Sequence, residues 1–286
     1  MSSDDRDEVK LSRKQRMLRD NPICCFCGGG VQSTGEDHIP PRACFPAGYH
    51  PEGMEFPACD DCNQSTRPYD DMFGFYAMAV DFDEENLDAE TFNKRIQGLL
   101  NNYPDSLPVE NLSANQKRRK LKSMGMQRPA GQFLRDVGIV SVPQSSKIAV
   151  YVAIRKLACA IYYKETGKIL SSAHRIAGMW QQAQDAQRKP IANYWNDLLP
   201  EYRQLTRSNI RDYGRRFCYK FGFMEEDDFF AFIVQIGSGL MLSGMTIPPD
   251  KGLEPPMAMP IWRVDDPWDC LGKDSELLQP QQPIES

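Results

Sequence analysis

Apolar residues spaced three or four positions apart predict several helices in the first two thirds of the chain. The stretch 145–167 is apolar around most of its circumference, which predicts a buried helix that Gly167 ends. Shorter apolar patterns predict helices over 69–80 and 87–103. The more polar stretch 172–187 is also predicted to be helical.

Beyond Tyr213 the pattern changes to that of strands. Phe217, Tyr219 and Phe221 alternate with other residue types, and the apolar runs 229–236 and 239–247 follow after turn residues. This pattern predicts a three-stranded antiparallel β-meander. The predicted fold class is therefore α+β, with a helical region before a C-terminal meander.

Shifts in composition predict four parts. Residues 1–20 form a charged arm, 21–80 a small module rich in Cys, Gly and Pro, and 81–247 an accessory domain of helices and the meander. Residues 248–286 hold 8 of the 21 prolines and are predicted to be a largely extended or disordered acidic tail.

The overall composition is that of a globular protein. Of the 286 residues 41% are hydrophobic and 26% charged, which excludes collagen-like and fully disordered chains. No apolar stretch approaches the roughly 18 residues of a membrane span, and the first 20 residues carry 11 charges. We therefore expect a cytoplasmic protein that does not engage a membrane.

The net charge of −5 belongs to one end of the chain. Residues 246–286 contain 8 acidic and 3 basic side chains, so the preceding 245 residues carry 31 of each sign. The acidic balance therefore neither supports nor excludes a local basic surface for nucleic acid.

The cysteines carry the first chemical signal. There are nine, an odd number that argues against a disulfide framework, and six of them lie between positions 24 and 62. Two CxxC pairs predict a closed, structural Zn²⁺ site made by Cys24, Cys27, Cys59 and Cys62. The alternative is four buried free thiols. Cys25 is expected to be a spectator, although an exchange with Cys27 stays open, and Cys44 a small core residue.

The residues around the second pair extend this signal. Asp37 and His38, followed by two prolines, lie between the pairs, and Asn63 directly follows Cys62. Over about residues 21–70 the chain resembles the HNH (ββα-metal) endonucleases in their zinc-stapled form. The resemblance implies an N-terminal zinc-bound ββα-metal module, in which a β-hairpin and a helix grip one divalent metal. It also implies hydrolysis of phosphodiester bonds in DNA, in a setting such as phage defence or DNA processing.

Within that resemblance, three residues have catalytic roles. His38 is the candidate general base, because a neutral imidazole can take a proton from water near physiological pH. Asp37 and Asn63 are the candidate ligands of a catalytic Mg²⁺ or Mn²⁺, to which they offer oxygen atoms. Adjacent strand residues point to opposite faces, so Asp37 and His38 need a strand end or bulge to serve one site.

The chain departs from the family at its middle position, because residues 43–58 contain no Asn. His50 is either the substitute or a surface loop histidine. Asp70 and Asp71 are weaker candidates to assist the metal. Arg42 and Arg67 are candidates to contact the phosphate. The alternative is that they are ordinary solvated charges.

A dense basic cluster lies further along the chain and consists of Lys117, Arg118, Arg119, Lys120 and Lys122. These residues are predicted to bind the phosphates of DNA, with RNA not excluded. The alternatives for this cluster are a solvated helix face or a partner-binding surface. Separately, the accessory domain is a candidate to bind a protein partner or to form a homo-oligomer. The competing hypothesis for the whole chain is a non-catalytic, zinc-stabilised subunit that binds nucleic acid or protein.

Overall fold

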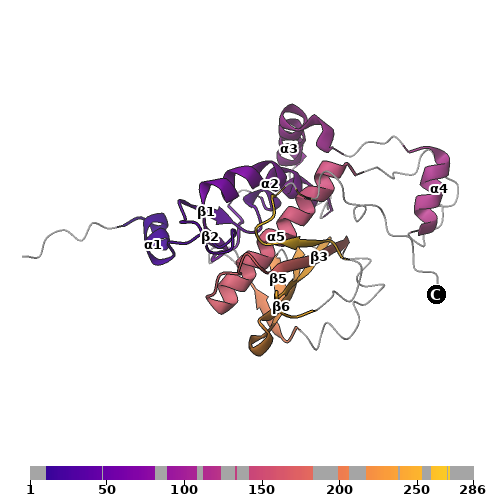
Figure 1. Cartoon of the computed structure of the whole chain (residues 1–286). Coiled ribbons are helices and arrows are strands. Elements are labelled where there is room, and N and C mark those ends of the chain that lie inside the picture. Colours follow the sequence, from indigo (N-terminus) through magenta and orange to yellow (C-terminus); the bar gives the residue numbers. More distant parts are fainter. Residues whose placement is uncertain are drawn as a thin grey trace, which may run out of the picture.

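A computed structural model of the chain has an α+β fold (Figure 1). The structure describes residues 11–46, 48–80, 89–107, 112–123, 133, 142–182, 199–205, 217–237, 239–252, 259–268 and 270. The described part contains five α-helices, a two-stranded hairpin and a six-stranded antiparallel sheet. Three short 3-10 helices also occur, η1 (Arg42–Cys44), η2 (Pro104–Ser106) and η5 (Glu225–Asp227).

The N-terminal part consists of a short helix, a hairpin and a long helix. Helix α1 (Arg13–Asp20) is followed by strands β1 (Gly35–His38) and β2 (Glu55–Ala58), which pair antiparallel, and then by α2 (Asp60–Val80). Helix α2 begins directly after Cys59, so the helix predicted over 69–80 is only its C-terminal half. The hairpin therefore leads directly into a helix through the second cysteine pair.

Three further helices follow the pattern of apolar residues. Helix α3 (Ala89–Asn102) lies within the stretch predicted from 87–103, and α4 (Ala114–Ser123) covers the basic segment. Helix α5 (Gln144–Thr166) ends at Gly167, whose φ of 70° is left-handed, as the sequence predicts. Glycine adopts this conformation without the steric cost that a Cβ atom imposes.

The meander is confirmed, but it forms only half of the sheet. The strand order is β4-β5-β6-β7-β3-β8, with every neighbouring pair antiparallel. The strands are β3 (Arg175–Gln182), β4 (Glu201–Gln204), β5 (Phe217–Met224), β6 (Phe229–Ile236), β7 (Leu240–Ile247) and β8 (Ile261–Arg263).

The helix predicted over 172–187 is wrong where the structure describes it. Residues Arg175–Gln182 form β3, which pairs with β7 on one side and β8 on the other. A Cβ atom at Gly178 would lie 2.4 Å from the side chain of Ile154, so glycine lets α5 approach this strand closely. Strands β7 and β8 are distant from β3 in sequence, so the polarity of 172–187 alone could not predict this pairing. Residues 183–187 lie outside the described residues.

The predicted extended or disordered tail contains a segment that docks on the body of the protein. Strand β8 pairs with β3, and Trp262 is buried with 3% of its surface exposed. Arg155 of α5 donates hydrogen bonds to the backbone carbonyls of Val264, Asp266 and Pro267. Burial of one aromatic side chain and these bonds hold the segment 259–268 on the body. The rest of the tail beyond 270 lies outside the described residues.

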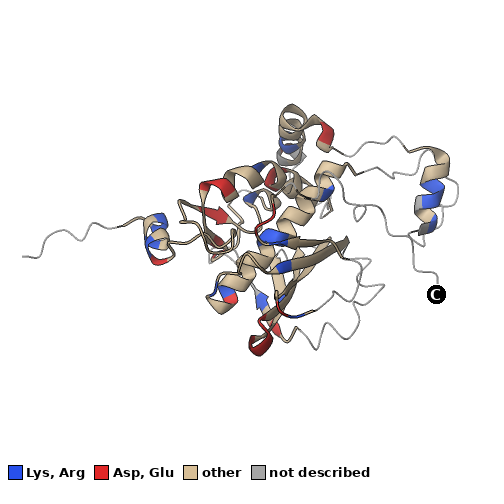
Figure 2. Ribbon diagram, in the orientation of Figure 1, with Lys and Arg blue, Asp and Glu red and all other residues tan. Residues whose placement is uncertain are grey.

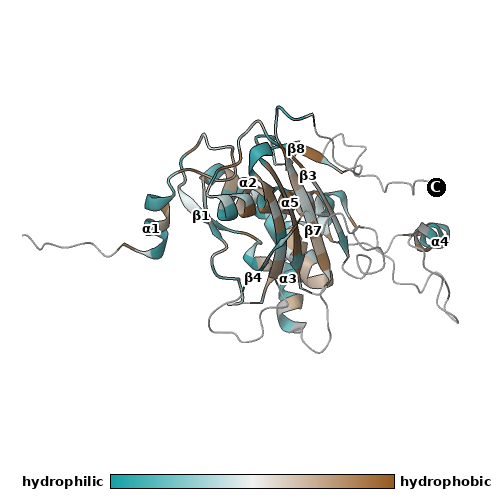
Figure 3. Ribbon diagram, turned by 90° about the horizontal axis from the view of Figure 1, so that it is seen from below, coloured by the Kyte–Doolittle hydropathy of each residue, from teal (hydrophilic) through white to brown (hydrophobic). Residues whose placement is uncertain are grey.

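Helix α5 lies at the centre of the structure, packed against α2 on one side and against β3 and β7 on the other (Figures 1 and 3). Its buried apolar residues belong to one hydrophobic cluster that extends from Phe26 in the first cysteine pair to Phe232 in the sheet. The N-terminal part and the sheet thus share a core. Among the described residues, no helix combines the length and apolar character that a membrane span needs.

Candidate functional site

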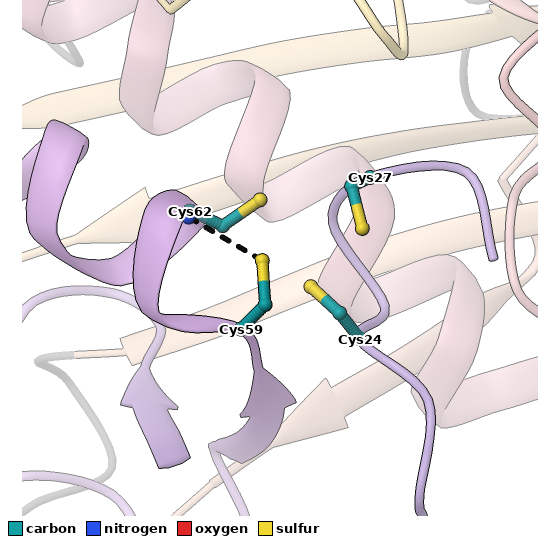
Figure 4. Close-up of side chains that lie close together, drawn as sticks. All are labelled: Cys24, Cys27, Cys59 and Cys62. Atoms are coloured by element: carbon teal, nitrogen blue, oxygen red, sulfur yellow. Dashed lines mark hydrogen bonds between the residues drawn. The ribbon is translucent and has the colours of Figure 1, made fainter. Parts of the chain in front are cut away.

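The four cysteines predicted to bind zinc come together. Their sulfur atoms all lie within 4.8 Å of one another. Figure 4 shows the pair from the loop before β1 and the pair at the start of α2 pointing toward a common centre. This arrangement of Cys24, Cys27, Cys59 and Cys62 is compatible with a structural zinc ion.

Local backbone geometry builds both pairs. The amide of Phe26 donates to Sγ of Cys24, and the amide of Cys62 donates to Sγ of Cys59. Gly28 has a φ of 78°, and a Cβ atom there would lie 2.6 Å from Ser172. Glycine therefore serves two needs in this turn, the left-handed conformation and the close approach of another segment.

The sulfur atoms interact strongly with one another. Hydrogen bonds from the thiols of Cys27 and Cys62 lower the pKa of Cys24, and the same bonds raise the pKa of those two donors. A divalent ion would replace these shared protons. Cys25 is buried outside the cluster, and Cys44 is a buried core residue, as the sequence predicts.

Asp37 and His38 point to opposite faces of β1. The strand continues through both residues without a bulge, with Asp37 opposite Phe56 and His38 opposite Glu55. Asp37 lies on the buried face and is 7% exposed, whereas His38 is half-buried. The structure therefore does not direct these two side chains into one cavity.

Asp37 is paired with a lysine from the accessory region. Nζ of Lys156 lies 2.7 Å from Oδ2 of Asp37 and 2.8 Å from Oδ2 of Asp70, and it donates to Oγ1 of Thr66. Burial disfavours the charge of Lys156, but Asp70 and Asp37 outweigh it and raise the pKa of the ammonium group. Burial also raises the pKa of Asp70, to about 6, against the opposing effect of Lys156. The sequence contains no local signal for this pairing.

His38 lies in a different environment, a cavity of about 660 Å³. The guanidinium of Arg42, from η1, donates to Nε2 of His38 across 2.6 Å. The ring of His50 meets that of His38 edge to face, with centroids 4.8 Å apart. The titratable residues lining the cavity are Arg13, His38, Arg42, His50, Glu52, Glu55, Asp71 and Arg95.

Both imidazoles of this cavity favour the neutral form. Burial and the charge of Arg42 lower the pKa of His38. Burial and the neighbouring His38 lower the pKa of His50 to about 4. His50 is buried rather than a surface loop residue, and its ring lies beside that of His38; its role as substitute for the family's middle Asn stays a prediction.

The other predicted residues lie around these two features. Asn63 is half-buried in the first turn of α2, and Arg67 is exposed one turn later. Neither residue lines the described cavities. Asp71 lines the His38 cavity, whereas Asp70 pairs with Lys156.

The basic cluster lies on α4, whose charged residues appear in blue in Figure 2. Arg118 and Arg119 are exposed, but Lys117 is 2% exposed and does not present its charge to a phosphate. The side chain of Lys120 lies outside the described parts. In Figures 1 and 3, α4 lies at the opposite end of the molecule from α1.

No protein-family model, curated protein or solved structure matches the chain. The resemblance to HNH endonucleases therefore rests on the sequence motif alone. What the geometry adds is the four-cysteine cluster and, separately, the cavity that holds His38.

Proposed function

We propose that the protein is a zinc-stapled, HNH-like endonuclease that hydrolyses phosphodiester bonds in DNA at the His38 cavity, with RNA not excluded. The observation that carries this proposal is the convergence of two imidazoles and three arginines in one cavity, on the hairpin that leads into the second cysteine pair. Imidazole can accept a proton from water, and guanidinium groups pair with phosphate oxygens.

The cavity offers one group for binding the phosphate and one for accepting a proton from water. Arg42 lies at the exposed edge, where it can pair with the scissile phosphate. Nε2 of His38 accepts from Arg42, so a phosphate that pairs with Arg42 would have to draw the guanidinium away before this nitrogen could accept a proton from water. The zinc cluster fixes the start of α2 close to the hairpin and keeps the cavity walls in place.

The predicted catalytic metal does not fit at Asp37. A divalent ion would supply positive charge next to the phosphate, but the ammonium of Lys156 already provides a cation at Oδ2 of Asp37. We therefore assign no step to Asp37 as a metal ligand. The role of Asn63 as a ligand stays a prediction, and no step is assigned to it.

The same ion pair favours a second candidate function. The four-cysteine cluster is present, but Lys156 compensates the charge of Asp37, the predicted ligand of the catalytic metal. This combination is expected of a subunit that binds its partner without catalysing a reaction. In that case the arginines of the cavity would bind a phosphate group or an acidic partner without turnover.

A plasmid-nicking assay with Mg²⁺ or Mn²⁺ separates the two functions. We expect His38→Ala to lower the rate by about 10²- to 10⁴-fold, the usual contribution of an acid–base group. His174→Gln is the matched control, because His174 contacts Asp228 and lies outside the cavity. Zinc content should be equal in all three proteins. If the wild type does not nick DNA with either metal, the endonuclease hypothesis is wrong and the hypothesis of a binding subunit remains.

A further inference from the structure

We infer that His38, His50 and Glu55 form a second metal site, which takes a divalent transition ion rather than Mg²⁺. Their candidate ligand atoms all lie within 4.8 Å of one another. The inference rests on the proposed function for its catalytic meaning, because it names the ligands of the ion that the reaction uses. It also makes His38 a ligand instead of the general base, so that water bound to the ion would supply the nucleophile.

The hairpin register brings two of the three ligands together. His38 and Glu55 are directly opposite each other in β1 and β2, so their side chains lie on the same face of the hairpin. The third ligand, His50, comes from the loop between the strands and packs its ring against His38. Ligand atoms around one ion lie about 3 Å apart, so small side-chain rotations are enough to close the site.

The hydrogen bonding of His50 is that of a metal ligand. Its Nε2 lies 2.9 Å from the carbonyl oxygen of Pro40, which can only accept. Nε2 therefore carries the proton, and Nδ1 keeps its lone pair. Metal-bound histidines usually donate their other ring nitrogen to a carbonyl or carboxylate in this way, which fixes the ring.

Two arginine side chains contact the candidate ligands, and their positive charges lie where the charge of a bound metal ion would lie. Arg42 donates to Nε2 of His38, and Arg13 lies 2.7 Å from the Glu55 carboxylate. Both guanidinium groups line the same cavity and lie at its surface. An ion bound by His38 and Glu55 would displace them, and the displaced arginines would then be free to pair with a phosphate.

The donor set selects the class of ion. Two imidazoles and one carboxylate suit first-row transition ions, whereas Mg²⁺ prefers oxygen ligands and retained waters. Mn²⁺ is the best probe, because it is the weakest binder of the series and does not compete for four thiolates. The zinc of the cysteine cluster would thus stay in place during a titration.

The test is a Mn²⁺ titration of the zinc-loaded full chain, followed by electron paramagnetic resonance. We expect Mn²⁺ to bind with a nitrogen hyperfine coupling from imidazole. Glu55→Gln and His50→Ala should each weaken binding by at least ~10-fold, the minimum lost when the surroundings of a site are disturbed. Glu52→Gln is the matched control, since Glu52 lines the cavity outside the cluster and should leave affinity unchanged. Arg13→Gln should strengthen binding, because it removes a competing cation.

The outcomes separate the metal site from the enzyme. Bound Mn²⁺ without nitrogen coupling, or an affinity that Glu55→Gln leaves unchanged, overturns the site even if the protein nicks DNA. Nitrogen-coupled Mn²⁺ that both variants weaken supports the site even if no nicking is found. Loss of nicking in His38→Ala with full Mn²⁺ affinity returns His38 to the role of general base and overturns the assignment of this residue as a ligand.

Discussion

The ammonium group of Lys156 lies 2.7 Å from the carboxylate of Asp37, although the two residues belong to α5 and β1. Lys156 is 1% exposed, and the same nitrogen also pairs with Asp70 in α2. One buried cation therefore joins the hairpin, the helix that follows it and the central helix of the fold. The buried charge of Asp37 in the hairpin is therefore compensated by a residue from outside the N-terminal part.

We expect Lys156→Met to lower the free energy of unfolding by about 3–5 kcal/mol, because it leaves Asp37 and Asp70 buried without a cation. Urea denaturation measures the change. Lys164→Met on the same helix is the control, because Nζ of Lys164 donates an exposed bond to the carbonyl of Gly53. Adding Asp37→Asn and Asp70→Asn to Lys156→Met should restore part of the loss. An unaltered unfolding midpoint in Lys156→Met would show that the pair does not contribute to stability.

Removing one ligand of the cysteine cluster should remove the zinc. We expect Cys59→Ser to abolish stoichiometric zinc and to unfold the region around the hairpin, because metal binding contributes folding free energy there. Metal analysis and circular dichroism measure the two effects. Cys270→Ser, which changes an exposed cysteine, should alter neither. Wild-type protein purified without near-stoichiometric zinc would contradict the cluster's role.

The exposed cations of α4 should contribute to DNA binding through phosphates. We expect Arg118→Gln with Arg119→Gln to weaken binding and to reduce the slope of log K against log salt by about 2, one for each lost phosphate contact. Fluorescence anisotropy at several salt concentrations measures the slope. Lys94→Gln in α3 is the control, because Lys94 pairs with Glu90 on the surface. An equal slope in the double variant would assign α4 to solvent or to another partner.

The docked end of the chain should contribute to global stability. Trp262 is buried in β8 and its ring lies 5.4 Å from that of Tyr151. We expect Trp262→Ala to cost about 3–5 kcal/mol, as for other buried aromatic side chains. Arg263→Ala at the neighbouring exposed position should cost far less. If both variants unfold at the wild-type denaturant concentration, then the segment is a dispensable tail after all.

Local sequence determined the elements whose signals are contained within a few turns of chain. The long helix ending at Gly167, the helix near 89–102 and the meander strands follow from apolar spacing and turn residues, because these signals act between near neighbours. The two CxxC pairs likewise predicted the four residues of the cysteine cluster, since the short spacer directs both sulfur atoms of a pair to one side.

Tertiary structure alone decided what those elements meet. The polar stretch containing Arg175–Gln182 became a strand because β7 and β8 supply hydrogen bonds on both of its edges. Asp37 faces Lys156 because α5, more than a hundred residues away in sequence, packs against α2, the helix that follows the hairpin. His38 meets His50 and Glu55 through strand register and loop path, which composition and spacing do not encode. Long-range contacts of this kind depend on how whole elements pack, so a pattern along the chain predicts the ligand types but not which of them share a cavity.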